Sequence, residues 1–288
     1  MTQPTATQRA QTDTFIAAAR ESDSRALPLA SPFLTLRGIG LSYGERTILR
    51  GVDLSVSPGE LVSVLGPSGS GKSTLLRIAA GLLAPDTGTV DVDGTALTGP
   101  RPDVALAFQD PCLLPWLSVE RNVAFGLTFA RQPALSRETR RSRIDAALTE
   151  VGLAHAHQLH PRQLSGGMAQ RVALARCLAR QPRALLLDEP FGALDEVTRA
   201  DMQRLLVTVV RDTGAATVLV THDIDEALLV SDRIVLLGNQ GRTLAQWQID
   251  VPSPRETHVQ ALGALRIDIL QALQQAMSRD ATAAFPAP

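Results

Sequence analysis

The stretch Gly66-Pro-Ser-Gly-Ser-Gly-Lys-Ser-Thr74 decides the fold, and it follows directly on the apolar run Leu61-Val-Ser-Val-Leu65. Its lysine, Lys72, is the only lysine in the chain, because every other cation among the 28 Lys and Arg residues is an arginine. An ammonium is a compact point charge with three donors, whereas a guanidinium is a broad planar fork. A loop that curls round a triphosphate has room for the ammonium alone. The sequence therefore predicts a loop that binds the phosphates of ATP or GTP.

The flanking residues predict the strand, loop and helix that a phosphate-binding loop requires. Leu61–Leu65 is typical of a buried strand, and Lys72–Ala80 of a helix that ends at Gly81. Backbone N–H groups of such a loop point at phosphate oxygens from the helix N-terminus. A Gly- and Ser-rich surface turn is the alternative, which the flanking elements disfavour. The predicted nucleotide-binding residues are Gly66, Pro67, Ser68, Gly69, Ser70, Gly71, Lys72, Ser73 and Thr74.

A second motif, Leu185-Leu-Leu-Asp188-Glu189, places two acids at the end of an apolar strand. Asp188 suits a water-mediated contact to Mg²⁺, for which Ser73 would supply a hydroxyl ligand, while Lys72 would bridge the outer phosphates. Glu189 can polarise an attacking water as a general base. Two adjacent acids can also mark an ordinary exit from a strand. Their combination with a phosphate loop favours the metal interpretation.

Composition and charge limit the class of protein. A length of 288 residues with 44% hydrophobic and 20% charged residues fits a globular protein with a full core. The net charge of -1 argues against a nucleic-acid partner. No run approaches the roughly 18 apolar residues of a membrane helix, and the N-terminus lacks a basic start followed by an apolar signal core. We therefore expect a cytoplasmic protein that reaches a membrane only through a partner.

Short apolar runs with intervening helices indicate a parallel sheet covered on both faces. Such runs occur at Ala184–Leu187 and Thr217–Thr221, with a helical pattern between them at Glu196–Arg211. Residues 34–36 and 48–56 have β character, and Thr87–Gly94 is typical of a hairpin. The sequence thus predicts an α/β fold.

The domain boundaries follow from changes in composition and periodicity. Residues 1–31, rich in Thr, Gln, Ala and Ser, are expected to form a flexible extension. We place an ATPase domain at 32–252, with a helical sub-domain at about 110–180. The periodicity of Arg255–Met277 predicts an amphipathic helix, so residues 253–288 are a C-terminal helix and tail. The helical patterns in the sub-domain are Ser118–Ala130, Arg137–Val151 and Met168–Arg180.

A third motif, Leu164-Ser-Gly-Gly-Met-Ala-Gln170, precedes the last of these helices. Ser165, Gly166 and Gly167 predict a helix N-cap and a second anion site, although alone they favour a simple capped helix. With the other two motifs, the stretch resembles the signature loop of ATP-binding cassette (ABC) ATPases. The order of glycine loop, Gln109, signature, Asp188-Glu189 and His222 is similar to that family from about Phe33 to Gln248.

The resemblance implies a P-loop NTPase (RecA-like) core with a parallel sheet, an N-terminal antiparallel β sub-domain and an inserted α-helical sub-domain. It implies that Tyr43 stacks on adenine, although a strand-edge tyrosine is the alternative. Gln109 would be a hinge that senses Mg²⁺ and the γ-phosphate, and Asp195 would lie in a loop that crosses to the partner subunit. His222 would donate a hydrogen bond to the γ-phosphate and hold the attacking water. A purely structural histidine at the end of a strand is the alternative.

Two departures from the commonest pattern, Met168 for Gln and Gly192 for Ser, are similar to one branch of the family, the ATPase subunits of importers for nitrate, taurine and aliphatic sulfonates. This branch implies ATP and Mg²⁺ as cofactors and a homodimer that encloses two ATPs. It also implies a peripheral position at the cytoplasmic face of the bacterial inner membrane, with a periplasmic binding protein as an indirect partner. Transmembrane permease subunits would contact the loop of Trp116, which alternatively packs inside the helical sub-domain.

Two other functions stay open from the sequence. One is an ABC-type ATPase outside transport, in DNA repair or on the ribosome, although repair members insert a long coiled coil and ribosomal ones usually carry two cassettes. The other is a P-loop phosphotransferase, which would leave the signature loop without a role. In the leading hypothesis Lys72, Glu189 and His222 carry the catalysis of ATP hydrolysis.

Overall fold

A six-stranded sheet forms the centre of the protein, in strand order β10-β9-β3-β8-β7-β6. The structure is a computed structural model that describes residues 31–128 and 131–283, so the extension predicted for 1–31 lies almost wholly outside the described residues. Neighbouring strands are parallel except for β10, which runs antiparallel to β9. The strands are β3 (Leu61–Leu65), β6 (Val104–Ala107), β7 (Ala184–Asp188), β8 (Ala216–Val220), β9 (Arg233–Leu237) and β10 (Thr243–Gln248).

A second, four-stranded sheet is antiparallel and has the order β2-β1-β4-β5. The hairpin predicted at 87–94 joins β4 to β5 and turns at Asp93 and Gly94, which both have positive φ. Positive φ at both central residues is what a tight hairpin turn with the twist of its strands requires. The strands are β1 (Leu34–Tyr43), β2 (Arg46–Val56), β4 (Thr87–Val92) and β5 (Thr95–Ala96).

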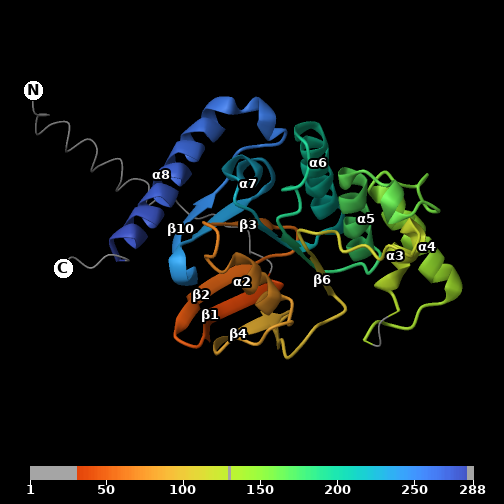
Figure 1. Cartoon of the computed structure of the whole chain (residues 1–288), viewed down its shortest axis with the longest axis horizontal. Helices are drawn as coiled ribbons and strands as arrows, with labels where there is room; N and C mark the ends of the chain where they lie inside the picture. The colour runs from red at the N-terminus through yellow and green to blue at the C-terminus, as the bar shows by residue number, and fades with distance from the viewer. Residues whose placement is uncertain (1–30, 129–130, 284–288) are drawn as a thin grey trace, which may run out of the picture. The chain divides into compact units, whose positions relative to one another are not determined.

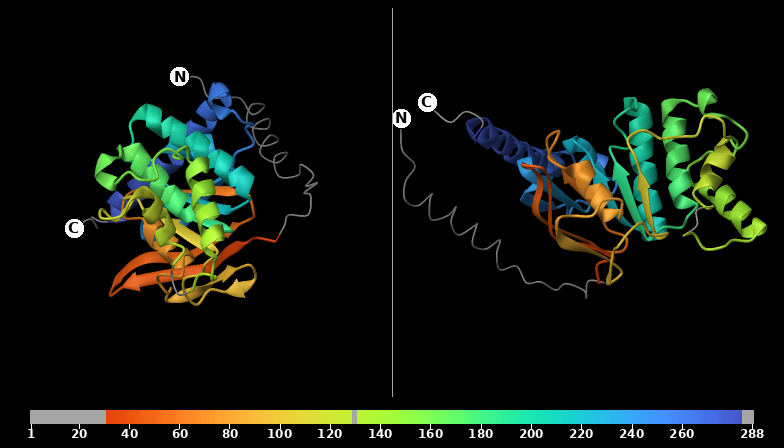
Figure 2. Two further views of the ribbon diagram at one scale, coloured as in Figure 1. Left: turned by 90° about the vertical axis from the view of Figure 1, so that its right-hand side faces the viewer. Right: turned by 60° about the horizontal axis from the view of Figure 1, so that its bottom comes forward.

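Helices cover the six-stranded sheet and extend beyond it (Figures 1 and 2). The helix predicted from Ser118 to Ala130 is wrong in length, because α3 ends at Phe125 and Gly126 caps it. Glycine inside a helix costs about 1 kcal/mol relative to alanine, so it favours the end of a helix. The α-helices are α2 (Lys72–Ala79), α3 (Val119–Phe125), α4 (Arg137–Glu150), α5 (Gly166–Leu178), α6 (Glu196–Thr213), α7 (Ile224–Val230) and α8 (Val259–Ala283). Short 3-10 turns are η1 (Pro161–Gln163), η2 (Asn239–Gly241) and η3 (Arg255–Thr257).

Side chains of the central strands alternate between two hydrophobic clusters. Leu186 of β7 packs in one cluster with the four-stranded sheet and α2. Its neighbours Leu185 and Leu187 pack in the other, with α3, α4, α5 and α6. Successive side chains of a strand point to opposite faces, so both faces of the sheet are buried, as the apolar runs predict. Because β3, β6, β7 and β8 are parallel, the loops that follow these strands meet at one edge of the sheet.

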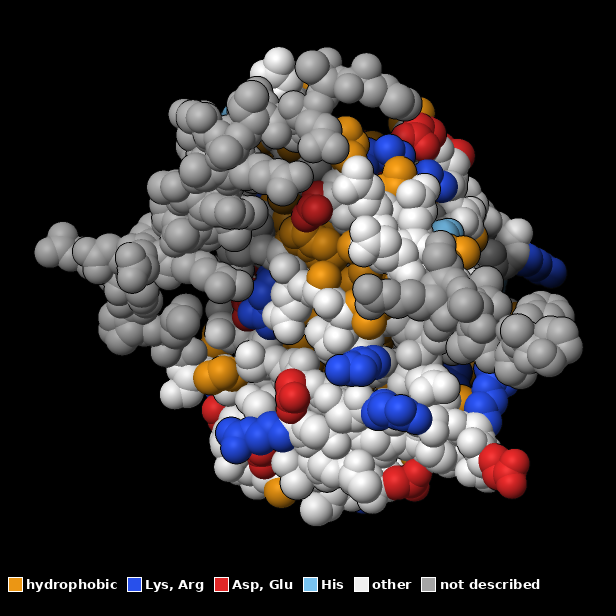
Figure 3. Space-filling view, turned by 90° about the vertical axis from the view of Figure 1, so that its left-hand side faces the viewer, with side chains coloured by type: hydrophobic (Ala, Val, Ile, Leu, Met, Phe, Trp, Pro, Cys, Tyr) orange, Lys and Arg blue, Asp and Glu red, His pale blue; other side chains and the backbone are white. Residues whose placement is uncertain are grey.

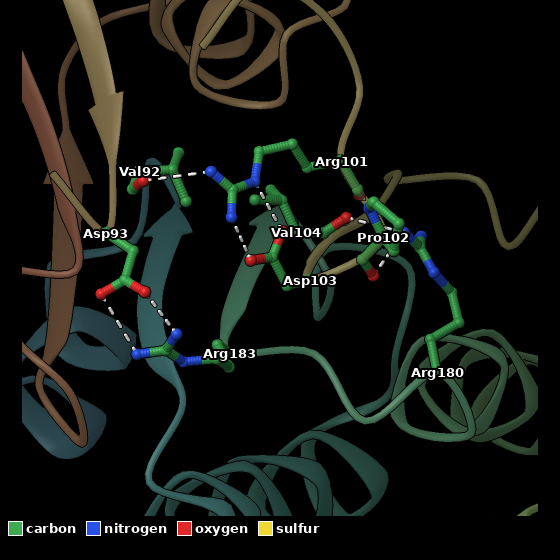
Figure 4. A network of polar contacts seen from close by, with 8 residues as sticks. All are labelled: Val92, Asp93, Arg101, Pro102, Asp103, Val104, Arg180 and Arg183. Atoms are coloured by element: carbon green, nitrogen blue, oxygen red, sulfur yellow. Dashed lines mark hydrogen bonds and ion pairs between the residues drawn. The ribbon is translucent and has the colours of Figure 1, made fainter. Parts of the chain in front are cut away.

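A network of arginines ties the four-stranded sheet to the start of β6 and β7 (Figure 4). The Arg101 guanidinium pairs with Asp103 at 2.6 Å and donates to the Val92 carbonyl at 3.1 Å. Arg183, which precedes β7, pairs with Asp93 of the hairpin turn at 2.6 Å. These contacts fix the hairpin of the antiparallel sheet against the central sheet.

Arg180, just beyond the end of α5, anchors the helical region to the same place (Figure 4). Its Nη2 lies within hydrogen-bond distance of three backbone carbonyls, those of Arg101 at 3.1 Å, Pro102 at 3.0 Å and Val104 at 2.9 Å. Burial lowers the pKa of this guanidinium, and the nearby Cys177 and Asp103 oppose the shift. A cation in this position holds the chain before β6 at the end of α5.

The C-terminal helix α8 packs on β10 and α7. Trp247 donates its indole N–H to Asp268 at 2.6 Å, and Arg266 pairs with Asp225 at 2.7 Å. Figure 3 views the molecule from the side where α8 and β10 lie in Figure 1, and hydrophobic side chains gather at the middle of this face. Within residues 31–128 and 131–283, no helix is long and apolar enough to cross a bilayer. The domain boundaries given above stay predictions.

Candidate nucleotide site

The glycine loop at residues 66–71 connects β3 to α2 and is closely packed on one side. A Cβ at Gly66 would lie 2.3 Å from the Leu237 carbonyl oxygen, and a Cβ at Gly71 would lie 2.9 Å from the Ile48 carbonyl oxygen. Gly71 also has φ +91°, which side chains other than glycine rarely adopt. At Gly69, by contrast, a Cβ would meet nothing within 4 Å. The loop is thus held tightly against the protein at its ends and is open at its middle.

The ammonium of Lys72 lies inside this loop. Its Nζ donates to the carbonyls of Gly66 at 2.8 Å and Pro67 at 2.9 Å, and the residue is only 6% exposed. Burial lowers the pKa of Lys72, an effect that the charges of Glu189 and Asp188 oppose. Two of the three donors of the ammonium therefore shape the loop, and no residue that the structure describes accepts a hydrogen bond from the third.

The loop also holds a polar atom that lacks a partner. The Ser70 hydroxyl is fully buried and has no hydrogen bond to any described residue. Buried polar groups are almost always paired, and this hydroxyl lies on the packed side of the loop, near Gly66. The remaining donor of Lys72 and the open middle of the loop at Gly69 fit the oxygens of a phosphate chain.

Ser73 and Asp188 form the part of the site that fits Mg²⁺. The Ser73 hydroxyl donates to Asp188 Oδ1 at 2.9 Å, which brings together the first turn of α2 and the last residue of β7. Burial raises the pKa of Asp188, and the hydrogen bond from Ser73 opposes the rise. A hydroxyl and a carboxylate are oxygen ligands of the kind that Mg²⁺ prefers.

Glu189 lies between Gln109 and His222. Gln109 Nε2 donates to Glu189 Oε2 at 3.3 Å, and His222 Nδ1 lies 3.3 Å from Glu189 Oε1. The three residues follow β6, β7 and β8, whose carboxyl ends meet at one edge because the strands are parallel. Glu189 has φ +44°, a backbone conformation that costs a non-glycine residue of order 1 kcal/mol or more and that clusters at functional sites.

The signature residues lie elsewhere. Ser165 caps α5, as expected, by accepting a hydrogen bond from the Met168 N–H at 3.3 Å. A Cβ at Gly167 would lie 2.2 Å from Thr198 Cγ2, and the Thr198 hydroxyl donates to Asp195 at 2.7 Å. The signature thus touches the start of α6, where Asp195 is the N-cap.

Ser165, Gly166 and Gly167 are not brought to the glycine loop. Within the described ranges they make no hydrogen bond or ion pair with residues 66–74. The chain therefore carries two separate groups of predicted nucleotide-binding residues. Lys72, Asp188 and Glu189 belong to the group at the glycine loop, and Asp195 belongs to the group at the signature.

Two aromatic residues predicted to have roles are on the surface. Tyr43, at the end of β1, is 59% exposed and pairs with Arg46 across the turn to β2. Trp116 is 69% exposed, so the alternative that it packs inside the helical region is wrong.

Two functional candidates, Gln170 and Glu226, were missed from the sequence. Gln170 is buried in α5 and bonds the loops that follow β6 and β7. Glu226 is buried beside His222; its carboxylate accepts from Thr221 at 2.6 Å and lies 3.5 Å from Arg199 Nε. Burial raises the pKa of Glu226, which the hydrogen bond from Thr221 opposes. Gln170 and Glu226 both contact segments that are far apart in the sequence. The local sequence pattern therefore does not indicate their roles, except that each residue lies near a recognised motif.

The sequence matches the ABC transporter family over residues 49–192. It is 47% identical to "Aliphatic sulfonates import ATP-binding protein SsuB 1" of Xanthomonas axonopodis pv. citri over 248 residues, which cover 85% of this chain and 98% of that protein. It is 44% identical to "Bicarbonate transport ATP-binding protein CmpC" of Synechococcus elongatus, with 85% of this chain and 38% of that protein covered.

A solved structure agrees with the fold. The dimeric post-hydrolysis state of an ATP-binding cassette bound to ADP and Pi superposes with a TM-score of 0.67 and 36% identity, and covers 75% of this chain and 98% of its own. This similarity confirms the predicted fold class, an α/β P-loop core with an antiparallel sheet and added helices. The motifs, their geometry and these relatives agree, and the chain belongs to the ABC transporter family.

Proposed function

We propose that this chain is the ATP-binding and ATP-hydrolysing subunit of a bacterial ABC importer. The observation that carries the proposal is the meeting of Lys72, Ser73–Asp188 and Glu189 with its two partners at one edge of the central sheet. The names of the relatives, which are import and transport ATP-binding proteins, support the direction of transport.

Each residue of the site would have a separate role in the transfer of the γ-phosphoryl group of ATP to water. Mg²⁺, when bound beside Ser73 and Asp188, would neutralise charge on the phosphate oxygens. Lys72 would donate its remaining N–H to the outer phosphates. Glu189 would accept a proton from the attacking water, while His222 and Gln109 hold the carboxylate in place. The transition state of such transfers is loose, so catalysis consists mostly of positioning and charge stabilisation.

We infer that two copies of the chain pair head to tail. The signature residues Ser165–Gly167 lie apart from the glycine loop of the same chain, and a two-fold pairing would bring each signature to the partner's loop. The γ-phosphate would then favour the closed dimer, because it contacts both subunits only in that state. The dimeric state of the similar cassette supports this pairing.

The remaining partners follow from the same proposal. The exposed Trp116 suits contact with a transmembrane permease, which would hold the subunit peripherally at the cytoplasmic face of the inner membrane. A periplasmic binding protein would deliver the substrate. We propose a small substrate with an anionic group, such as an aliphatic sulfonate, taurine or nitrate, and bicarbonate, named for one relative, is also a small oxyanion.

The test measures ATP hydrolysis by the purified chain with Mg²⁺, alone and with each class of partner. We expect activity that rises when the chain is reconstituted with the permease encoded beside it in lipid vesicles. Stimulation by DNA or ribosomes in place of the permease would favour the non-transport alternative. Transfer of the phosphoryl group to a small acceptor would favour a phosphotransferase.

A further inference from the structure

The amide of Gln170 bridges two loops of the candidate site from inside the protein. Its Nε2 donates to the Gln109 carbonyl at 3.1 Å and to the Pro190 carbonyl at 2.9 Å. The residue is only 5% exposed and belongs to α5, the helix that the signature residue Ser165 caps. A side-chain amide has two N–H donors, and both are used here.

The two carbonyls belong to the loops that carry the reactive side chains. Gln109 is itself the donor to Glu189, and Pro190 follows Glu189 directly. A proline has no backbone N–H, so Pro190 can only accept a backbone hydrogen bond, and its carbonyl accepts one from Gln170. Glu189 also has a positive φ, which persists only where the surroundings enforce it. The hydrogen bond from Gln170 falls on Pro190, the residue next to this strained position.

We propose that Gln170 is a positioning residue, which holds Glu189 and Gln109 in register and ties both to the helix of the signature loop. The proposal rests on the function proposed above. A closing partner that pushes on the N-terminus of α5 would act, through this amide, on the carboxylate that takes the proton. The Gln109 side chain also joins the two loops through Glu189, but among the described residues only Gln170 bonds both loops from outside them.

The competing explanation is that Gln170 serves only to satisfy buried carbonyls. That role would affect the stability of the fold and leave the kinetics of the folded enzyme unchanged. A positioning role instead lowers kcat while ATP binding is kept, because the Gln170 side chain makes no hydrogen bond to the glycine loop among the described residues. The two explanations therefore predict different results: the positioning role lowers kcat and leaves the Kd for ATP unchanged, whereas the purely structural role leaves both unchanged in the folded enzyme.

The test compares Gln170→Met, which keeps the volume and removes both donors, with Gln203→Met. Gln203 is a matched control, because it is 8% exposed, lies in α6 and its side chain makes no hydrogen bond to any described residue. At a temperature where circular dichroism shows all proteins folded, we expect kcat of Gln170→Met to fall roughly 10- to 100-fold. The Kd for ATP should change by less than about twofold, and Gln203→Met should keep kcat.

A double variant tests whether Gln170 acts through Glu189. If it does, Gln170→Met should add nothing to the loss caused by Glu189→Gln, because effects through one shared group are not additive. Should Gln170→Met fail to fold, Gln170→Asn keeps the amide but is one methylene too short to reach both carbonyls. An unchanged kcat in the folded variants overturns this proposal alone, whereas a wild-type protein without ATPase activity overturns the proposed function.

Discussion

The hydroxyl of Ser73 donates a hydrogen bond to the carboxylate of Asp188 at 2.9 Å, although the two residues are 115 positions apart. Ser73 lies in the first turn of the helix after the glycine loop, and Asp188 ends an inner strand of the central sheet. Their contact joins the phosphate-binding and the acidic parts of the site. Each part was predicted from a separate motif, and the contact places a hydroxyl and a carboxylate, two oxygen donors, side by side.

Replacing Lys72 with arginine should abolish nucleotide binding although it keeps the charge. The ammonium donates to two loop carbonyls and is almost fully buried, and the broad guanidinium does not fit the same space. We expect affinity for a fluorescent ATP analogue to fall by more than about tenfold. Arg211→Lys, at an exposed position of α6, is the control. Equal affinity of the Lys72→Arg variant and the wild type would contradict the assigned loop.

Glu189→Gln should still bind ATP but hydrolyse it slowly. Glutamine cannot take the proton of the attacking water, and general-base catalysis contributes roughly 10²- to 10⁴-fold. We expect slow single-turnover hydrolysis and, by size-exclusion chromatography with ATP, accumulation of a dimer. Glu150→Gln, at the exposed end of α4, should behave as wild type. Normal turnover of Glu189→Gln would remove Glu189 from the mechanism.

Asp188→Asn should stabilise the protein when no nucleotide is bound. Burial raises the pKa of Asp188 in the folded state, so the folded protein binds this proton more tightly than the unfolded chain does. The free energy of unfolding therefore falls as pH rises from the unfolded pKa through the folded pKa. Asparagine does not ionise, so the variant does not lose this stability. The difference in the free energy of unfolding between Asp188→Asn and wild type should grow as pH rises from the unfolded pKa to the folded pKa.

Urea unfolding at a series of pH values from about 4 to 8 measures this difference, since the unfolded pKa lies near 4. Asp212→Asn, at an exposed position of α6, serves as the control. A destabilised Asp188→Asn variant at neutral pH would show that the carboxylate is favourably paired without metal.

Arg180→Met should lower the free energy of unfolding by about 2–4 kcal/mol. The guanidinium serves three carbonyls, and each buried acceptor left without a donor costs about 1–3 kcal/mol, part of which water recovers. Arg137→Met, exposed at the start of α4, should change the same quantity by less than about 0.5 kcal/mol. Chemical denaturation checks both, and equal effects would mean that the network does not anchor the helical region.

Trp116→Ala should leave the ATPase activity of the isolated chain unchanged and reduce its stimulation by the permease. The side chain is 69% exposed, so its removal opens no cavity, whereas aromatic anchors carry much of the binding energy of an interface. Val259→Ala, equally exposed on α8, is the control. Stimulation that survives Trp116→Ala would place the permease contact elsewhere.

The sequence determined the local parts of this protein. Glycines, one lysine and a flanking apolar strand specify the phosphate loop, because its backbone needs those residue types at that spacing. Four elements were missed, namely β6, α7, β9 and β10, and α3 was predicted too long. These elements are only four to seven residues long, and over so short a stretch the periodicity of hydrophobic residues does not distinguish a helix from a strand.

Only the tertiary structure decided which groups meet. The order of strands in the central sheet differs from their order in the chain, so no local pattern predicts that Ser73 reaches Asp188 or that Glu189 lies between Gln109 and His222. The same holds for Gln170, whose two acceptors are 61 and 20 positions away. A side chain's type is a local property, whereas its partner depends on how parallel strands bring distant loops to one edge of a sheet.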